Sequence, residues 1–554
     1  RGRRRLRSQR PATEANQKLV MMMAKTQRLS WLLLGLVVVA QVACGQDAYV
    51  KSKTSGPSAP TLDYLAAEDA SSPSTALLGA SSEEQAAWDD AALQTSPHLF
   101  VERNGTRLQT TDGKAYRYVG MNYWYGANLG SEGPGGNRAR LLKELDELSA
   151  RGITNLRVMA ASEGPNTEPY RIVPAMQTEP GVYDHQVLEG LDFLLAEMGK
   201  RGMRAIMCLT NEWAWSGGLA QYLVWAKYAK KIPYHPPSPG GSWEKFMHFT
   251  SHAFTDTKAI LMYHNHVRFI VNRVNSVSGL PYKEDPAIMA WELANEPRGM
   301  KYPDALFDWV KNTAGLIKDL DPKHMVTIGL EGDTIDPAYN GIDFEKLNSV
   351  EAIDYATIHI WVENWNWYDP WRPAASYPTA KKKALDYFQD HARRAKKIGK
   401  PLVFEEFGMS RDADTNADRY LPTTTTEWRD RYFEDMLSWV CLLGKDPNSA
   451  VVGANLWAYG GNAFEGVNKM WTPGGLWHPG DIFTGDPPHE AQGWYSIYSR
   501  DNATLAVIEK FADCIAPDDA PKPPHLVTRQ RQPRLGQRAS GSVESFIAET
   551  MDEP

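Results

Sequence analysis

Two glutamates of the 554-residue chain stand in sequence contexts suited to acid–base and nucleophilic chemistry. Glu296 follows Asn295 in the segment AIMAWELANEP, and Glu406 follows Glu405 in PLVFEEF. One carboxyl group can protonate a departing oxygen while a second, ionised one attacks the adjoining carbon, which is how a glycosidic bond is cleaved. Because the acid and the nucleophile need opposite protonation states at one pH, their surroundings must differ.

Other polar residues at the ends of apolar runs are candidates to tune this pair, namely Arg157, Asn211, Asn295 and His359. Arg157 and nearby hydrogen-bond donors would keep the nucleophile ionised, whereas a desolvated neighbour of that anion would hold its proton. Taken alone, Arg157 could be a structural ion pair and His359 a satisfied core histidine. Their occurrence together with two glutamates favours a functional site.

Eight short apolar runs carry these residues: RYVGMNY, ITNLRVM, MRAIMCL, AIMAWEL, MVTIGL, YATIHIW, PLVFEEF and VVGANLWAY. Most are followed by segments with apolar residues at helical spacing, such as Leu141, Leu145 and Leu148. Strands that alternate with helices pair in parallel, so the pattern predicts an α/β fold, a (β/α)8 TIM barrel with long loops at the carboxyl face. Active groups of such barrels lie where strands end, and the fourth and seventh strands would bring Glu296 and Glu406 face to face.

The two ends of the chain are expected to lie outside this barrel. Residues 1–45 contain basic residues before the run WLLLGLVVVAQVA, which predicts an upstream tail and a secretory signal peptide, and therefore a secreted, extracellular protein. A signal anchor and a lipoprotein attachment at Cys44 are the alternatives. Residues 46–97 and 516–554 are polar and aperiodic, so a disordered linker and a disordered tail are predicted around a catalytic domain at 98–515.

Composition narrows the possible partners. A net charge of -7 gives no electrostatic reason to expect nucleic acid, and no membrane contact is expected after signal cleavage. Four cysteines are too few for a disulfide scaffold or a CxxC metal site, so neither a metal nor a cofactor is expected. A bridge between Cys441 and Cys514 is possible, and Cys208 is expected to be a buried free thiol. We expect a monomer.

The segments WELANEPRG (291–299) and PLVFEEFG (401–408) resemble the acid/base and nucleophile signatures of glycoside hydrolase family 5. The third loop, LTNEWAWSGGLAQYLVWA, and the segment HNHVRFIVNRVNSVSGLPYKEDPAIMAWELANEPRG are similar to the endo-β-1,4-mannanase subfamily in residues and spacing. This likeness extends over residues 98–515. It implies a secreted enzyme that hydrolyses internal β-1,4-mannosidic bonds of mannan, glucomannan or galactomannan by a retaining double displacement.

The resemblance implies that Glu296 is the acid/base and Glu406 the nucleophile, with Glu405 pointing away. Strand alternation agrees, because adjacent residues of a strand face opposite sides. By the same likeness Asn295 contacts the 2-hydroxyl group of the sugar and Trp457 forms a platform for its ring. The substrate-binding residues expected in all are Arg157, Asn295, His359, Trp457, Trp124, Asn211, Trp213 and Trp361.

Two positions depart from the family pattern. Glu212 stands where the family often has asparagine, and its carboxylate could alter affinity in a neighbouring subsite. Trp361 stands where many relatives have tyrosine, and its indole N–H could donate to the nucleophile but could not accept. A β-1,4-glucanase of the same family and a non-catalytic carbohydrate-binding protein on the same fold remain alternatives.

Overall fold

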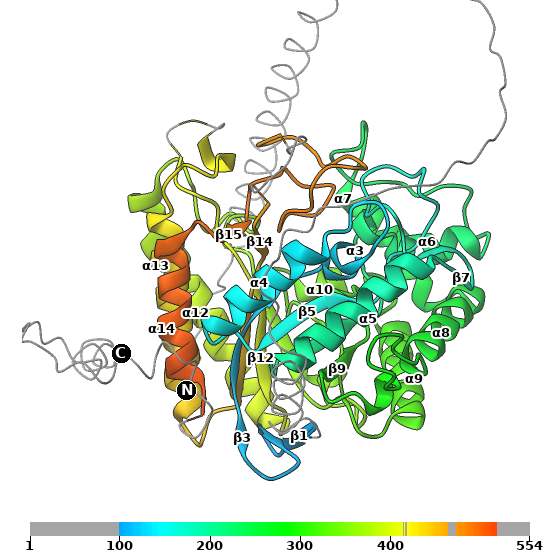
Figure 1. The fold of residues 1–554 in the computed structure, drawn as a ribbon, viewed down its shortest axis with the longest axis horizontal. Helices are drawn as coiled ribbons and strands as arrows, with labels where there is room; N and C mark the ends of the chain where they lie inside the picture. Colours follow the sequence, from blue (N-terminus) through cyan, green and yellow to red (C-terminus); the bar gives the residue numbers. More distant parts are fainter. Residues whose placement is uncertain (1–98, 414, 416–417, 464–471, 518–554) are drawn as a thin grey trace, which may run out of the picture. The chain divides into compact units, whose positions relative to one another are not determined.

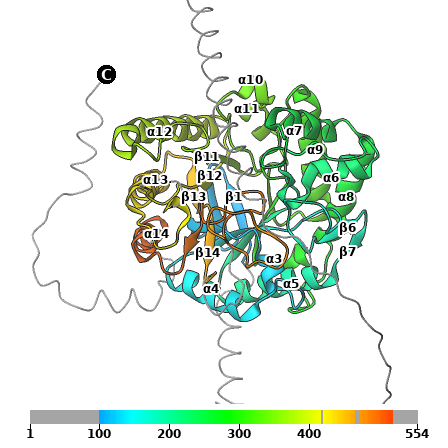
Figure 2. The ribbon, with the colours of Figure 1, turned by 90° about the horizontal axis from the view of Figure 1, so that it is seen from above.

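The computed structural model describes residues 99–517 except 414, 416–417 and 464–471. The predicted signal peptide, the linker and nearly all of the C-terminal tail lie outside the described residues. Within them, eight strands that pair in parallel form one sheet in the order β10-β9-β8-β5-β4-β13-β12-β11. Helices surround this sheet when it is seen from above (Figure 2), so the predicted barrel is confirmed.

All eight predicted apolar runs are strands of this sheet. They are β4 (Tyr118–Asn122), β5 (Asn155–Met159), β8 (Arg204–Cys208), β9 (Ile288–Glu292), β10 (Met325–Thr327), β11 (Ala356–Ile360), β12 (Leu402–Phe407) and β13 (Val451–Leu456). Almost every residue in them is buried. Parallel strands are covered by helices on one face and packed together on the other, which explains the nearly continuous apolar runs.

Long helices connect most of these strands. They are α4 (Arg138–Ala150), α5 (His185–Lys200), α8 (Thr257–Val271), α9 (Pro303–Leu320), α12 (Pro373–Lys397), α13 (Glu427–Lys445) and, after the last strand, α14 (Asn502–Ile515). Leu141, Leu145 and Leu148 of α4 are fully buried, as their spacing predicted. Within the described ranges, no helix combines the length and the apolar character needed to cross a bilayer.

Shorter elements decorate the barrel. The helices are α3 (Gly126–Gly130), α6 (Gly218–Trp225), α7 (Trp243–Thr250), α10 (Pro337–Asn340) and α11 (Phe344–Asn348), with 3-10 turns at Ala214–Ser216, Ser251–Phe254, Tyr282–Glu284 and Asp418–Tyr420. The strands are β1 (Val101–Asn104), β2 (Arg107–Thr110), β3 (Ala115–Tyr116), β6 (Gln177–Glu179), β7 (Val182–Tyr183), β14 (Tyr459–Gly461) and β15 (Ile497–Tyr498). The link between β10 and β11 contains only the short α10 and α11 among its residues, all of which are described.

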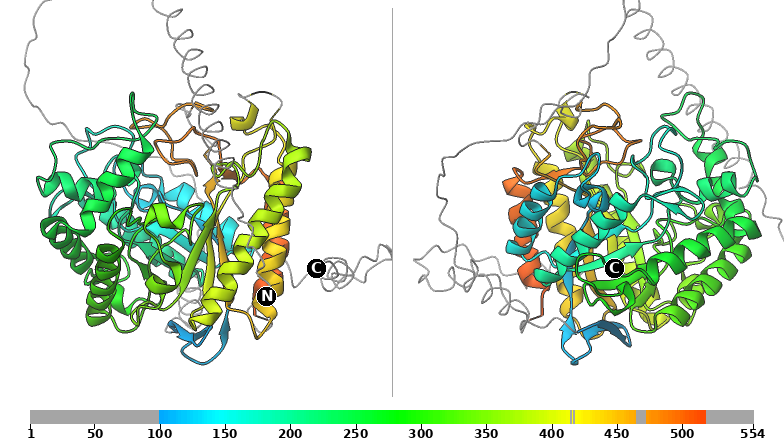
Figure 3. Two further views of the ribbon diagram at one scale, coloured as in Figure 1. Left: turned by 180° about the vertical axis from the view of Figure 1, so that it is seen from behind. Right: turned by 45° about the vertical axis from the view of Figure 1, so that its right-hand side comes forward.

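The two ends of the barrel are built differently. Strands β1–β3 form a small antiparallel sheet whose Val101 and Leu108 pack with residues at the starts of barrel strands, including Tyr118 and Met289. This sheet covers the amino end of the barrel, at the base of the views in Figures 1 and 3. The loops that follow the strands gather at the opposite, carboxyl end, which we call the mouth.

The seam of the barrel lies between β10 and β11, which form no strand pairing in the described residues. Hydrogen bonds bridge it instead. The His359 N–H donates to the Glu331 carbonyl at 3.0 Å, and the Thr327 hydroxyl donates to the Tyr355 carbonyl at 2.9 Å. These bonds place His359, near the end of β11, beside the loop that leaves β10.

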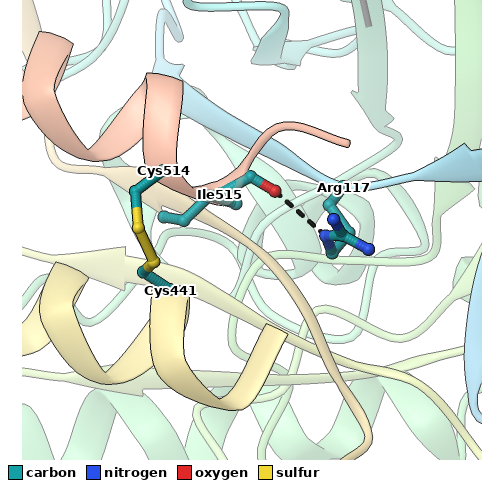
Figure 4. The surroundings of a disulfide bond; sticks show 4 residues. All are labelled: Arg117, Cys441, Cys514 and Ile515. Carbon is teal, nitrogen blue, oxygen red and sulfur yellow. Dashed lines mark hydrogen bonds between the residues drawn. A yellow bond between two sulfur atoms is a disulfide. The ribbon is translucent and has the colours of Figure 1, made fainter. Parts of the chain in front are cut away.

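A disulfide joins Cys441 of α13 to Cys514 of α14, with 5.8 Å between their Cα atoms (Figure 4). The bridge that the sequence left possible is thereby confirmed, and Cys208 is a buried free cysteine as predicted. The Arg117 guanidinium donates to the Ile515 carbonyl at 3.0 Å, which fastens the end of α14 near the start of β4.

Removing this disulfide is expected to destabilise the domain. The two cysteines are 73 residues apart, and the loop-closure entropy of that length corresponds to about 4 kcal/mol. A Cys441→Ser/Cys514→Ser variant should therefore unfold at a lower urea concentration, as measured by circular dichroism. The parent protein in reducing buffer should show the same shift, and an unchanged midpoint in both would contradict a stabilising role.

Candidate active site

The structure brings Glu296 and Glu406 together at the mouth. Glu406 belongs to β12, and Glu296 lies in the loop after β9 with a backbone φ of 53°. A positive φ is costly for a residue with a side chain, and such strain collects at functional sites. One carboxylate oxygen of each glutamate and one ring nitrogen of His359 lie within 4.8 Å of one another. The two side chains are close to fully buried, with 6% and 2% of their residue surface exposed.

Arg157, in β5, fixes the position of Glu406. Its Nη1 donates to Glu406 Oε1 and, at 3.1 Å, to Asn122 Oδ1. Its Nε and Nη2 donate to the two oxygens of Glu292 at 2.8 and 2.5 Å, a paired contact that sets the plane of the guanidinium. Nη2 also donates to Asn295 Oδ1 at 2.8 Å. The buried guanidinium of Arg157 therefore positions both Glu406 and Asn295, the residue before Glu296.

Glu296 accepts two hydrogen bonds, one on each carboxylate oxygen. Trp213 Nε1 donates to Oε2 at 2.6 Å, and His359 Nδ1 donates to Oε1 at 2.7 Å. The same Nδ1 lies 3.4 Å from Glu406 Oε2. Because a carboxylate can only accept, Nδ1 carries a proton here. His359 therefore connects the two glutamates.

Asn211 joins the loop after β8 to the loop after β9. Asn295 Nδ2 donates to Asn211 Oδ1 at 3.0 Å, and the same oxygen accepts from the Trp213 N–H at 3.0 Å. The Glu212 N–H donates to the Asn295 carbonyl at 2.9 Å. These bonds hold Trp213 where its indole reaches Glu296.

Trp124 and Trp457 lie on the same side of the site as Arg157 and Asn295. These four residues help to bound a hollow of about 10 Å³, large enough for about one water molecule. The Trp457 Nε1 atom is buried and has no hydrogen-bond partner among the described residues. The predicted sugar platform thus lines this hollow together with Arg157 and Asn295 and has an unused donor.

Trp361 lies beside this platform without bonding Glu406. Its ring centroid is 5.9 Å from that of Trp457 and 5.0 Å from that of Tyr495. Among the described residues, no hydrogen bond joins its indole to Glu406. Trp361 is therefore part of an aromatic wall, and the donor contact that its indole could have made is not observed.

Glu405 does not point away from the site, so that prediction was wrong. The register between β11 and β12 shifts between Ile358 and His359, and Glu405 is left without a partner in β11. Such a bulge breaks the alternation of side chains along a strand. Glu405 Oε2 consequently lies 3.5 Å from His359 Nε2 and 3.7 Å from Arg157 Nε, where it adds a further carboxyl group near the site.

Burial and charge together set the protonation of the cluster. Burial raises the pKa of Glu406 to about 7, against the lowering effect of His359 and Arg157. Burial acts in the same direction on Glu296, but the bond from His359 and the charge of Arg298 bring its pKa below the ordinary value. Burial lowers the pKa of His359. The charge of Glu406 and the hydrogen bond to Glu296 outweigh this effect and raise the pKa to about 10, so His359 is an imidazolium at neutral pH.

In the free protein, then, the pKa of Glu406 is raised and that of Glu296 is lowered, so the directions of the two shifts favour a proton on Glu406. Arg157 lowers the pKa of Glu406 in the expected direction, but burial outweighs its attraction, so the pKa stays above the ordinary carboxyl value. His359 Nδ1 contacts both carboxyl groups and the charge of Glu296 acts on Glu406, so their titration belongs to the pair. The predicted roles, with Glu296 as the acid and Glu406 as the nucleophile, require the other arrangement, with the proton on Glu296, when a substrate is bound.

The trio of Glu296, His359 and Glu406 also has the donor types of a metal site. Its protonation argues against that use. An imidazolium has no lone pair to offer a cation, and both His359 nitrogens face carboxylates, Nδ1 toward Glu296 and Nε2 toward Glu405. The contacts fit a hydrogen-bonded acid–base cluster.

Glu212, at one of the two unusual positions, is fully buried. Its carboxyl accepts a hydrogen bond from the Thr250 hydroxyl, and burial raises its pKa to about 8. It is therefore uncharged at neutral pH. Its effect on a neighbouring subsite stays a prediction.

Sequence reasoning missed several residues that support this site. They are Asn122, Glu292, Arg298 and Glu331. Arg298 forms an ion pair with Glu331 and lies over the Trp213 ring, 4.9 Å from its centroid. Glu292 could have been found, because it is a charged residue at the end of an apolar run. Asn122, near the end of the first run, and Glu331, directly after the fifth, carried the same signal, although their partners are distant in sequence.

Comparisons with known proteins agree with this geometry. A family model described as "GH family 5 beta-mannosidase-like" matches residues 98–518. A mannan endo-1,4-beta-mannosidase of Solanum lycopersicum is 32% identical over 347 residues, which are 60% of this chain and 77% of that protein. A putative mannan endo-1,4-beta-mannosidase of rice is 32% identical over 386 residues, 68% of this chain and 84% of that one. The crystal structure of a family 5 mannosidase from Rhizomucor miehei is similar, with a TM-score of 0.69 and 37% identity over 76% of this chain and 98% of that chain.

Proposed function

The chain belongs to the β-mannosidase-like group of glycoside hydrolase family 5, and we propose that it hydrolyses internal β-1,4-mannosidic bonds of mannan, glucomannan or galactomannan. It is a glycoside hydrolase, and its curated relatives are named mannan endo-1,4-beta-mannosidases. The observation that carries the proposal is the pair Glu296 and Glu406, which each contribute one oxygen to a group of atoms within 4.8 Å of one another. Arg157 donates a hydrogen bond to Glu406, and His359 donates one to Glu296.

The proposed mechanism is a retaining double displacement. Glu406 attacks the anomeric carbon and forms a covalent ester while Glu296 gives its proton to the departing oxygen. Water then attacks the same carbon, Glu296 takes a proton from it, and Glu406 is released. Inverting enzymes separate their carboxyl groups by roughly 6.5 to 9.5 Å to admit a water molecule, whereas retaining ones use about 5 to 5.5 Å. The spacing of at most 4.8 Å supports retention.

The residues around the pair would orient the sugar. The flat ring of Trp457 would carry the pyranose, and its unpartnered indole N–H would bond a hydroxyl group. Asn295, whose side-chain Oδ1 accepts a hydrogen bond from Arg157, would contact the 2-hydroxyl group. When a sugar enters, it removes the remaining water from the cluster, which strengthens each of these contacts.

Hydrolysis is expected to fall as the pH rises through about 7. The reaction needs one proton on the glutamate pair, and because burial raises the pKa of Glu406 to about 7, the pair loses that proton above this pH. The pKa of Glu296 is lowered, so a second, inhibitory proton binds only at acidic pH. A profile of kcat/KM on mannohexaose from about pH 3 to about pH 9 checks this. A rate that still climbs beyond about pH 8 would contradict it.

We also propose that the enzyme is secreted and acts as a monomer. The basic residues and apolar run before residue 45 and the Cys441–Cys514 disulfide, which suits an oxidising compartment, support secretion. The proposed site is complete within one chain, so the proposed chemistry needs no second copy. Expression in a secreting host, followed by N-terminal sequencing and gel filtration of the released protein, tests both points.

The substrate is tested by comparing reducing sugar released from mannan and from cellulose. Release from mannan with little from cellulose supports the proposal. The reverse result would favour the β-1,4-glucanase alternative. The catalytic residues common to the two kinds of enzyme do not distinguish the two orientations of the 2-hydroxyl group. Binding of mannan without cleavage would indicate a non-catalytic carbohydrate-binding protein.

A further inference from the structure

The segment 481–495, part of the connection from β14 to β15, crosses the mouth of the barrel. At its start, the Gly485 carbonyl accepts a hydrogen bond from Trp124 Nε1 at 2.9 Å. At its end, the ring of Tyr495 packs against Trp361. The orange loops at the top of Figure 1 contain this segment, and Figure 2 shows them above the central strands.

The middle of the same segment reaches a third loop. The His489 ring lies 5.0 Å from that of His235, which belongs to the loop after β8. His235 in turn stacks on Trp243 at 4.0 Å, and its ring is 6.0 Å from that of Trp213. Since Trp213 bonds Glu296, the segment passes over the region of the catalytic pair.

The segment is held in one conformation by its own hydrogen bonds. The Asp486 carboxylate accepts from the N–H groups of Gly493 and Tyr495, at 2.8 and 2.6 Å, and from the Ser496 hydroxyl. The Gln492 amide donates to the Asp486 carbonyl at 3.0 Å. Side chains carried between these anchors are therefore presented in fixed positions, which lowers the entropic cost of binding a ligand.

Several buried polar atoms near this crossing have no hydrogen-bond partner among the described residues. They are Glu490 Oε2, His489 Nδ1, His235 Nε2 and Trp457 Nε1. Buried polar atoms are nearly always bonded, so a group of unsatisfied ones at the mouth is available to bond a ligand or water. Donors and acceptors are both present in the group, as a ligand rich in hydroxyl groups requires.

Glu490 is also within electrostatic range of the catalytic pair. Burial raises the pKa of Glu490 well above its ordinary value, and the charges of Asp486, Glu406 and Glu296 raise it further. These carboxyl groups make the region unfavourable for a negatively charged ligand. A neutral sugar fits, whereas a uronic acid would be repelled.

We propose that Glu490, His489 and His235 form a subsite that binds the hydroxyl groups of a neutral pyranose next to the bond being cleaved. This inference rests on the proposed function and specifies it. Glu490 would exchange hydrogen bonds with one hydroxyl group, and the free His489 and His235 nitrogens would bond others. The segment 481–495 acts as a fixed wall of the mouth that carries two of the three groups.

The test compares Glu490→Ala, Glu490→Gln and, as a matched control, Glu434→Ala on mannohexaose. Glu434 is exposed on the outer face of α13. Loss of a hydrogen bond to a charged or strongly polar group is expected to lower kcat/KM of the alanine variant about 10- to 100-fold, chiefly through a higher KM. The glutamine variant should recover most of this loss because its amide can both donate and accept. The control should match the parent.

The kcat/KM values of the Glu490 variants decide whether the proposed subsite is correct. An alanine variant with unchanged kcat/KM overturns the subsite, and so does a glutamine variant as impaired as the alanine variant, because the defect would then be structural. Unfolding temperatures of all the proteins identify such a defect. If the parent itself does not cleave mannohexaose, the proposed function fails and the subsite assignment falls with it.

Discussion

Replacing Glu406 by alanine is expected to lower kcat on mannan by about ten-thousand-fold or more, the scale on which loss of a nucleophile acts in hydrolases. The neighbouring carboxyl groups of Glu405 and Glu292 cannot take its place. Glu405 faces Arg157 Nε and His359 Nε2 from the strand bulge, and Glu292 is occupied by Arg157. Reducing-sugar release at high enzyme concentration measures the residual rate.

Two controls make the Glu406 result interpretable. Glu434→Ala should keep parental activity, since its side chain lies on the outer face of α13. Circular dichroism should show that the Glu406→Ala protein is folded. A folded Glu406→Ala protein with full activity would refute the nucleophile assignment.

Replacing Glu296 by glutamine removes the proton donor and should slow mannan hydrolysis by about 100- to 10,000-fold. The loss should depend on the leaving group. An aryl β-mannoside whose phenol is acidic needs no proton to depart, so formation of the covalent intermediate should remain fast. Its breakdown should be slow, because Glu296 is also the base that activates water.

Stopped-flow release of phenol checks this second prediction. A rapid burst equal to the enzyme concentration, followed by slow turnover, is expected for Glu296→Gln. Equal slowing of the first step for good and poor leaving groups would contradict the acid role. The glutamine side chain of Glu296→Gln keeps the size of the glutamate, but its single amide oxygen can accept from Trp213 or from His359 and not from both.

The strands were readily predictable from sequence, whereas features fixed by tertiary contacts were not. Each strand of a parallel sheet is buried on both faces and appears as an apolar run, and the leucines of α4 show a helical period. The seam at His359 and Glu331 left no sequence pattern, because it is closed by hydrogen bonds between residues at the ends of two strands. The small antiparallel sheet of β1–β3 that covers the amino end of the barrel was likewise not predicted from the sequence.

The positions of the site residues followed from strand ends and from the family motifs. The structure brings Glu296, Glu406, Arg157 and His359 into contact. Glu405 was misjudged because a bulge in β12 cannot be read from local alternation. The protonation order also escaped prediction, since it depends on how burial weighs against the charges of several distant residues.

The segment that carries Glu490 shows the limit of local patterns most clearly. Residues 481–495 have no regular spacing, and their importance arises from contacts with loops that follow three different strands. Trp124, Trp361 and His235 fix where the segment crosses the mouth. A carboxyl group there is indistinguishable in sequence from any other polar loop residue.

The central claim, that Glu406 attacks while Glu296 protonates across a single sugar bond, is tested most directly by the configuration of the first product. Proton NMR of mannohexaose hydrolysis should show the β-anomer of the new reducing end before mutarotation produces the α-anomer. Initial appearance of the α-anomer would mean a single displacement by water, and the double-displacement account would be wrong.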